Sequence, residues 1–466
     1  MFFRVENLGP LRSAEVDLSK ELILLTGPNS TGKTYLAWSI YGLFRGPDAP
    51  EVFRGLVKEI LDSPEQGIAF ERITALWPML LDAIAEHLNG RLHLCFAAER
   101  QSFANVKVSI RPGTGEPEVR QTEDSYTLGF SAGARVRVSW GARIAVEVFK
   151  MLDGGMPGRG KLTRLDPIAF MQFPDDEKSK LTEWLEVNLA TIIMSRCWPE
   201  CTLLPTERTA VDMFAKELSI RRTDLMNRVA EAQLSLPADA ELTSAQLGVA
   251  TRDVGRYPWP IQDSLLAAND LVFAARQESE FADLAIELET LLGGAVTSSK
   301  EGAVGFKPTG GSPEIGIHLT SSVVKSLASL VFFLRHHARK GNLLMIDEPE
   351  LNLHPDNQRK IARVLVKAVN RGLRLIMSTH SDYFLRELNN LIILSRDTTA
   401  IREVRAKHGY TESEMLAPAK VGVYLFKDGT AADIPVTEDG FEVQSIEDEI
   451  NRMNAMSQEI YAAIHE

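Results

Sequence analysis

A glycine-rich loop that follows a short apolar run and precedes a helical segment constrains the fold of this chain most strongly. Residues 21–26 (ELILLT) have the composition of a buried strand, and residues 35–41 (YLAWSIY) that of a helix. The loop between them consists of Gly27, Pro28, Asn29, Ser30, Thr31, Gly32, Lys33 and Thr34. It matches the pattern GxxxxGK[ST], and the strand before it and the helix after it are the context that supports a phosphate-binding loop. The sequence therefore predicts an α/β fold of the P-loop class.

The residue types of this loop suit it to bind a nucleotide. Glycines let the backbone wrap closely around phosphate so that consecutive N–H groups point inward, and the N-terminus of the following helix adds partial positive charge. We expect Lys33 to reach the β- and γ-phosphates of ATP and the Thr34 hydroxyl to ligate Mg²⁺. All eight loop residues are thus predicted to bind the nucleotide, with ATP and Mg²⁺ as the ligands.

A second apolar run, residues 342–346 (NLLMI), ends in two adjacent carboxylates. A continuous apolar run is expected of a strand that is buried on both faces of a parallel sheet. Asp347 and Glu348 follow at its C-terminal end, where open α/β sheets place their ligand chemistry. We expect Asp347 to hold Mg²⁺ through water and Glu348 to polarise the attacking water as a general base.

A further strand and a histidine follow the acidic pair. Residues 356–370 have apolar positions at helical spacing, and residues 373–379 read as another strand, which ends at His380. A histidine at this strand end is placed to hydrogen-bond a γ-phosphate oxygen. Lys33, Glu348 and His380 are therefore the predicted catalytic residues.

The order of these motifs resembles that of the ABC-type ATPase superfamily. Residues 319–330 (LTSSVVKSLASL) occupy the place of the signature helix, and its serines suit an N-cap. Unlike the common LSGGQ form, this segment has no glycine, and Lys325 stands near the usual Gln or Glu. The resemblance implies that Ser321, Ser322 and Lys325 contact the nucleotide held by another copy of the chain, in a head-to-tail dimer or a higher oligomer.

Three segments more closely resemble the stand-alone ABC-type ATPases of the OLD-like (overcoming-lysogenization-defect) group of bacterial antiphage defence, as in PARIS- or Septu-type systems. They are residues 321–327, residues 347–355 (DEPELNLHP) and residues 378–385 (STHSDYFL). The resemblance covers residues 1–45 and 285–400. It implies a switch or sensor ATPase that controls a separately encoded effector, such as a nuclease or toxin.

The remaining sequence predicts the domain organisation. We expect residues 1–210 to form the N-terminal part of an ABC ATPase with an antiparallel β lobe, which has strands at 91–110, 126–139 and 141–149. Residues 211–292 are expected to be a helical insertion, residues 293–400 the C-terminal part of the ATPase, and residues 401–466 a C-terminal extension with a hairpin and a final helix. No heptad pattern persists for three or four repeats, so no long coiled coil is expected.

Two segments keep alternative interpretations. Residues 203–209 (LLPTERT) resemble a strand-end element of the same family, so that Arg208 belongs either to a replacement of the glutamine loop or to the ordinary surface. A local basic stretch is either a partner or nucleic-acid surface or a solvated helix face. It contains Lys216, Arg221, Arg222 and Arg228.

The overall composition limits the classes of partner that are expected for this chain. The 466 residues carry a net charge of −12, whereas a domain that coats nucleic acid is usually basic. Nucleic acid is therefore not indicated by the charge. No apolar run approaches the roughly 18 residues that cross a bilayer, and three cysteines are too few for a disulfide framework. These features favour a cytoplasmic protein without a membrane partner.

One alternative function stays open at this point. A DNA-repair or recombination ATPase of the recombination-mediator or break-repair type would carry the same motifs, and DNA-stimulated turnover would distinguish it. A chain with its own nuclease is disfavoured, because residues 401–466 are short and hold no Glu plus Asp-x-Asp arrangement.

Overall fold

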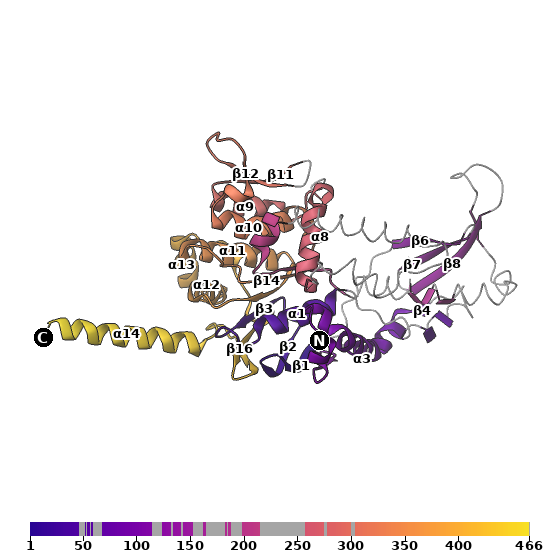
Figure 1. The fold of residues 1–466 in the computed structure, drawn as a ribbon, viewed down its shortest axis with the longest axis horizontal. Coiled ribbons are helices and arrows are strands. Elements are labelled where there is room, and N and C mark those ends of the chain that lie inside the picture. The colour runs from indigo at the N-terminus through magenta and orange to yellow at the C-terminus, as the bar shows by residue number, and fades with distance from the viewer. Residues whose placement is uncertain are drawn as a thin grey trace, which may run out of the picture. The chain divides into compact units, whose positions relative to one another are not determined.

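The computed structural model divides by its internal contacts into two compact units (Figure 1). The first comprises Met1–Phe3, Leu43–Gly90 and Val108–Glu200, and the second comprises Arg4–Gly42, Arg91–Lys107 and Cys201–Glu466. The structure describes residues 1–45, 68–113, 124–131, 134–140, 143–151, 162–164, 198–214, 257–274, 277–299 and 303–465, with parts of 52–58 and 182–187.

A nine-stranded mixed sheet, most of whose strands lie in the second unit, has the order β10-β14-β15-β3-β16-β17-β2-β1-β5. The strands are β1 (Phe2–Leu8), β2 (Leu11–Asp17), β3 (Leu22–Thr26), β5 (Lys107–Arg111), β10 (Cys201–Leu204), β14 (Leu343–Asp347), β15 (Arg374–Ser378), β16 (Val421–Lys427) and β17 (Thr430–Ile434). The run from β10 to β16 is parallel. Every residue of β3 and β14 is buried, as expected of strands covered on both faces.

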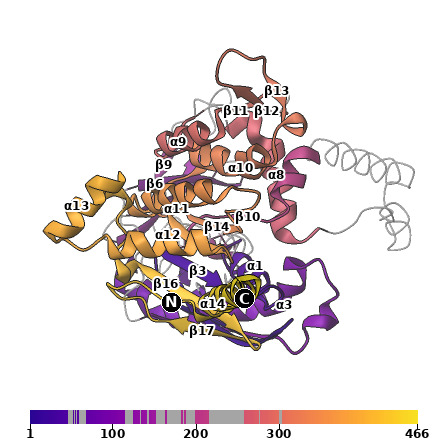
Figure 2. The same cartoon turned by 90° about the vertical axis from the view of Figure 1, so that its left-hand side faces the viewer.

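Four helices share the apolar core of this sheet in the described ranges, and they are α9 (Ala282–Leu292), α10 (Ser322–Phe332), α11 (Pro355–Asn370) and α12 (Asp382–Ile393). The chain also forms α1 (Lys33–Phe44), α8 (Trp259–Ala274), α13 (Thr399–His408) and α14 (Gln444–His465). Figure 2 shows α9, α10 and α11 as neighbours, with α12 beside α11. Leu327 of α10 and Ile361 of α11 share one apolar core with Leu344 of β14. None of the helices in the described ranges is long and apolar enough to span a bilayer.

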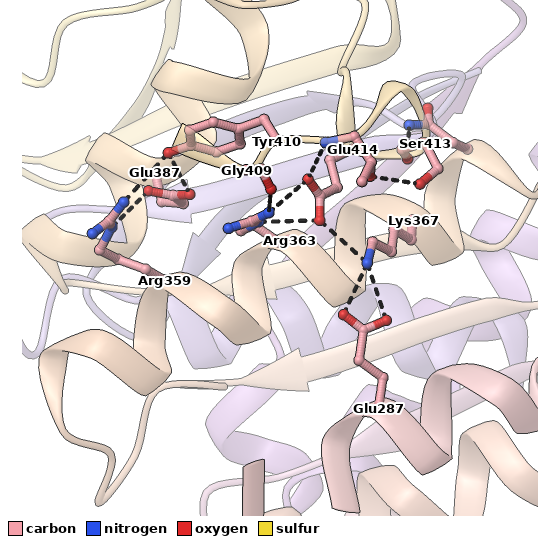
Figure 3. Close-up of polar contacts among 11 residues, drawn as sticks. Glu287, Arg359, Arg363, Lys367, Glu387, Gly409, Tyr410, Ser413 and Glu414 are labelled. Carbon is pink, nitrogen blue, oxygen red and sulfur yellow. Dashed lines mark hydrogen bonds and ion pairs between the residues drawn. The ribbon is translucent and has the colours of Figure 1, made fainter. Parts of the chain in front are cut away.

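The polar face of α11 is held by a row of three cations one helical turn apart (Figure 3). Arg359 Nε lies 2.7 Å from Glu387 Oε2 of α12, and Arg363 Nη2 lies 2.9 Å from Glu414 Oε2. Lys367 Nζ lies 2.8 Å from Glu287 Oε1 of α9. Because ion pairs hold both ends of α11 to neighbouring helices, the loop that precedes α11 ends at a helix of fixed position.

The C-terminal residues contribute to the main sheet. β16 pairs in parallel with β3, and β17 pairs with β2, so two strands expected in an extension lie in the core of the sheet. The predicted hairpin is present. Its two turn residues, Asp428 and Gly429, have φ of 50° and 74°, the conformation that a type I′ turn requires.

The first unit contains most of the predicted antiparallel lobe. β6 (Asp124–Ser131), β7 (Ala134–Trp140) and β8 (Arg143–Met151) form an antiparallel sheet with β4 (Ile68–Ala69) and β9 (Leu162–Arg164). The prediction of strands at 126–139 and 141–149 is confirmed. The strand expected at 91–110 is wrong over its first part, because α3 (Phe70–Cys95) continues through it, and only β5 is a strand. Buried Leu88, Leu92 and Cys95 keep helical spacing.

Helices α8 and α9 lie within residues 211–292. A three-stranded antiparallel sheet then leads toward α10. It comprises β11 (Gly294–Ser298), β12 (Val304–Pro308) and β13 (Ile315–Gly316). The basic residues Lys216, Arg221, Arg222 and Arg228 lie outside the described residues.

Candidate nucleotide-binding site

The phosphate loop joins β3 to α1, as the sequence predicts, and its glycines are required by close backbone approaches. Gly27 and Gly32 have φ of 132° and 101°. A Cβ on Gly27 would lie 2.4 Å from the carbonyl oxygen of Phe426 in β16, and one on Gly32 would lie 2.6 Å from Leu11 Cγ. The loop is thus seated on strands from both ends of the chain, and side chains at these glycines would fill the space that its backbone occupies.

Lys33 lies buried beneath this loop. Its Nζ donates to the carbonyl oxygens of Gly27 (2.8 Å) and Pro28 (2.7 Å). Burial lowers the pKa of Lys33, while the carboxylates of Glu348, Asp347 and Glu350 oppose that shift. These interactions place the predicted phosphate-binding ammonium beside the predicted acidic residues, so the two motifs converge at one edge of the sheet.

Sheet register explains this convergence. Asp347 at the end of β14 is opposite Ser378 of β15, and Ser378 is opposite Leu25 of β3. The acidic end therefore lies two strands away from the strand that enters the phosphate loop. Asp347 is buried, and its Oδ1 accepts a 2.7 Å hydrogen bond from Ser378 Oγ.

The free oxygen of Asp347 suits a cation. Oδ2 is buried and accepts no hydrogen bond from any residue in the described part of the chain. Mg²⁺ is usually held by one or two carboxylates together with substrate phosphates. The carboxylate of Asp347 and the hydroxyl of the exposed Thr34 are suitable ligands, so these two residues would hold Mg²⁺. When bound, Mg²⁺ would neutralise charge on the phosphates.

Glu348 adopts an unusual backbone conformation that its surroundings hold in place. Its φ is 48°, in the left-handed region that non-glycine residues rarely adopt. Its N–H donates to the Ser378 carbonyl (3.0 Å), and its carbonyl accepts from Leu351 N (3.1 Å). Its Oε1 lies 3.4 Å from His380 Nδ1. Such strained residues persist only where the surrounding structure fixes them, and they cluster at functional sites.

Glu350 supports this site, although the sequence analysis gave it no role. It is buried, and its Oε1 accepts hydrogen bonds from Thr379 Oγ1 (2.5 Å) and from the backbone N–H of His380 (3.3 Å). Burial raises the pKa of this carboxyl. Glu350 thus fixes the end of β15 that carries His380. In the sequence, its position two residues after Glu348 is the feature that could have pointed to a role at this site.

The signature residues lie at the N-terminus of α10. Ser321 is the N-cap, and its side chain accepts from Val324 N at 3.4 Å. Ser321 and Ser322 are exposed, and Lys325 is half-buried. Over the described ranges, no hydrogen bond or ion pair joins these three residues to the phosphate loop of the same chain.

Arg208 is buried rather than on the surface, so the second of its two interpretations is wrong. Only 1% of the residue is exposed. Its guanidinium donates to backbone carbonyl oxygens at the ends of β10 and β14 and in α10. The acceptors are those of Pro205, Ser326, Asp347 and Glu348. Since these partners are backbone atoms, no side-chain pattern in the sequence pointed to them.

Comparison with known proteins supports the activity that this site indicates. Residues 261–385, from α8 to α12, match the model of the AAA ATPase domain family. A search of curated proteins matched none of them. The matched segment carries α10, Asp347, Glu348 and His380, and the phosphate loop lies in the same sheet. The chain is therefore an ATPase with a mixed α/β fold.

Solved structures with a similar fold include three SMC head domains. One is the Smc head domain with an extended coiled coil bound to the C-terminal domain of ScpA from Pyrococcus furiosus, at 12% identity over 97% of this chain and 98% of that chain, with a TM-score of 0.34. A second is the SmcHead bound to the C-winged helix domain of ScpA, at 12% identity over 93% and 96%, with a TM-score of 0.33. A third is the SMC head domain from Thermotoga maritima, at 10% identity over 94% and 98%, with a TM-score of 0.31.

The buried Asp347 predicts a specific pH dependence of stability. Burial raises its pKa to about 6 from the ordinary 3.8. A carboxyl with a raised folded-state pKa contributes stability that is complete below its unfolded pKa and is lost as pH rises through the folded value. In metal-free buffer, the stability of Asp347→Asn should therefore rise relative to that of the wild type as pH rises from about 5 to about 7, by an unfolding free energy on the order of 1 kcal/mol, with a corresponding gain in Tm.

Thermal denaturation in EDTA across this pH range measures the difference in Tm between the variant and the wild type. In a separate assay with Mg²⁺, ATP hydrolysis by the variant should be lost. A Tm difference that does not change with pH would show that Asp347 does not titrate there.

Proposed function

We propose that this chain is an OLD-like switch ATPase of antiphage defence, in which ATP closes two copies around shared sites and hydrolysis reopens them to control a separately encoded effector. The observation that carries this proposal is the convergence of Lys33, Asp347, Glu348 and His380 at one sheet edge, while the N-terminus of α10 is exposed. Such a site has the parts for ATP hydrolysis, and in the described part of the chain no hydrogen bond joins Ser321, Ser322 or Lys325 to its phosphate loop.

Glu348 is the proposed general base. Its carboxylate is partly exposed and lies beside His380, so a water molecule on the γ-phosphate side can reach it. The carboxylate would take the proton of the attacking water as the new oxygen–phosphorus bond forms and the bond from the γ-phosphorus to the β,γ-bridging oxygen breaks, with ADP as the leaving group. His380 would donate to a γ-phosphate oxygen, and Lys33 would leave the Gly27 and Pro28 carbonyls for the phosphates. Stabilising the developing phosphate charge is the main task of such sites.

A second copy is the proposed source of the missing signature contacts. Ser321 and Ser322 are exposed at a helix N-terminus, where backbone N–H groups and partial positive charge favour an anion. If two copies face each other head to tail, one two-fold operation completes both sites, and a two-fold axis is the commonest oligomer symmetry. ATP would then bind the closed arrangement better than the open one, which is what a ligand-driven switch requires.

Helix α14 is the proposed contact for the effector. Its exposed apolar side chains recur at intervals of three and four residues, on one face of the helix, and they are Met453, Met456, Ile460 and Ile464. Amphipathic helices of this kind commonly dock in apolar grooves of partner proteins. The effector would bind this face and be held or released as the ATPase changes state.

Co-purification from the native operon tests the proposal. The Glu348→Gln chain, which should retain ATP, and the Lys33→Ala chain, which should not bind it, are expected to carry different amounts of the effector. Met456→Glu with Ile460→Glu should remove the effector in both states. Ala455→Glu with Gln458→Glu adds the same charge to the opposite face of α14 and should leave binding intact.

Three results would contradict this function. Equal amounts of effector in the two nucleotide states would exclude a nucleotide-controlled switch. DNA cleavage by the purified chain alone, lost on mutation of its own carboxylates, would favour a self-contained nuclease. ATP turnover that rises strongly with added DNA would favour a DNA-repair ATPase.

A further inference from the structure

A buried arginine joins the signature helix to the strand end that carries the proposed base. We propose that Arg208 is a positioning residue, which makes the placement of Glu348 depend on the position of α10. The inference rests on the proposed function, in which Glu348 activates water and α10 faces the nucleotide of another copy. Through Arg208, the closure of α10 around the partner's nucleotide would fix the position of Glu348 in the same chain.

The contacts of Arg208 define this route. Nε donates to the Ser326 carbonyl in α10 (2.8 Å), and Nη1 donates to the Asp347 carbonyl (2.7 Å). Nη2 donates to the Glu348 carbonyl (2.7 Å). Since a guanidinium is planar and rigid, a shift of one acceptor must be followed by the others or break a charge-assisted hydrogen bond. One side chain thus spans α10 and the two consecutive carbonyls of the acidic motif.

The local environment makes these bonds costly to break. Burial lowers the pKa of Arg208, while the nearby carboxylates of Asp347, Asp212, Glu350 and Glu348 oppose that shift. A buried cation needs partners for its N–H groups, and losing one leaves an unsatisfied charged donor. Arg208 makes no ion pair with a carboxylate among its hydrogen bonds in the described residues; it binds carbonyl oxygens instead. Its charge is therefore used to hold backbone positions.

The same part of α10 has two further attachments. Asn352 Nδ2 donates to Ser326 Oγ (3.0 Å), so the loop after Glu348 also holds Ser326. One turn later, Ser329 Oγ donates to Asp212 Oδ2 (2.6 Å), which ties α10 to the segment that carries Arg208. Ser326 Oγ in turn donates to the carbonyl of Ser322 (2.9 Å), at the N-terminus of the helix. A displacement at that N-terminus is thereby passed to Ser326 and, through Arg208, to Glu348.

A matched pair of substitutions tests this inference. Arg208→Lys keeps the charge but not the planar set of donors, so it should lower the single-turnover rate of ATP hydrolysis by about 10²-fold and leave the KM for ATP unchanged. Arg405→Lys is the control. Arg405 is also buried, and it also donates to backbone carbonyls, those of Leu394 (2.7 Å) and Arg396 (2.8 Å), in α12–α13. It should lower Tm to a similar extent without changing the rate.

A second variant probes the same route from the other side. Asn352→Gly removes the amide that holds Ser326 but keeps the φ of 63°, which glycine tolerates. Its rate should also fall, and its effect should not add to that of Arg208→Lys, because the two act through one residue.

Several results would overturn the inference. They are a wild-type rate in Arg208→Lys, an equal loss of rate in Arg405→Lys, a change confined to KM, or additive effects. If Arg208→Lys does not fold, an unchanged rate in Asn352→Gly overturns it as well. Glu348→Gln separates this failure from that of the proposed function, because a normal rate in that variant removes the base assignment itself.

Discussion

Replacing Glu348 with glutamine should leave ATP binding intact and lower hydrolysis by roughly 10²–10⁴-fold, the usual contribution of a positioned base. Glutamine has nearly the same shape and can keep the backbone bonds to Ser378 and Leu351. The change removes only the carboxylate that is proposed to accept the proton from water. Phosphate release under saturating ATP and Mg²⁺ measures the loss, and equilibrium binding of ATP measures what is retained.

The control for this substitution is Glu287→Gln. Glu287 lies on α9, where it pairs with Lys367, and it has no contact with the proposed site among its hydrogen bonds in the described part of the chain. Its turnover should stay at the wild-type level. Near-normal turnover of Glu348→Gln would contradict the assignment of Glu348 as the base.

Replacing Lys33 with alanine should abolish both the binding of ATP and its hydrolysis. The ammonium is buried under the phosphate loop, and its present partners are two carbonyl oxygens of that loop. Alanine leaves no charge to meet the β- and γ-phosphates, whereas the fold loses no buried ion pair. The free protein should therefore keep its Tm, and the increase in Tm that ATP gives the wild type should disappear, since only a ligand that binds the native state stabilises it.

An ATP-dependent increase in Tm in Lys33→Ala as large as that of the wild type would contradict this role. A fall in the Tm of the free variant would instead indicate that Lys33 mainly supports the fold.

The phosphate loop and the acidic strand could be predicted because their information is local. A buried parallel strand is a continuous apolar run, and the residues after it stand at a known edge of the sheet. β3, β14 and β15 all follow this rule, so the convergence of Lys33 and Asp347 was expected from sequence alone. A helix that opens with serines suited to an N-cap was expected in the same way, and in the structure Ser321 is the N-cap of α10.

Other features depend on contacts between distant parts of the chain. β16 could be recognised as a hairpin strand, but its place between β3 and β17 is set by pairing across most of the sequence. Arg208 looked like any arginine after a strand, because its four acceptors are backbone oxygens from three separate segments. The helical continuation of α3 through residues 91–95 was missed because a short apolar stretch there suits a strand as well as a helix.

The central claim, that each hydrolytic site combines residues of two copies, is tested most directly by mixing two inactive chains. Lys33→Ala disables the phosphate loop, and Ser321→Arg places bulk and charge at the exposed cap of α10, where the partner's nucleotide would lie. Each variant alone should be inactive. In a mixed dimer, one site joins the intact loop of one chain to the intact α10 of the other.

ATP turnover of the equimolar mixture is the measurement, with mixed dimers demonstrated by differently tagged chains. Random pairing of two equivalent copies predicts recovery of about a quarter of wild-type turnover if the sites work independently. No recovery, in a sample where mixed dimers are shown to form, would contradict sites shared between independent halves of a dimer.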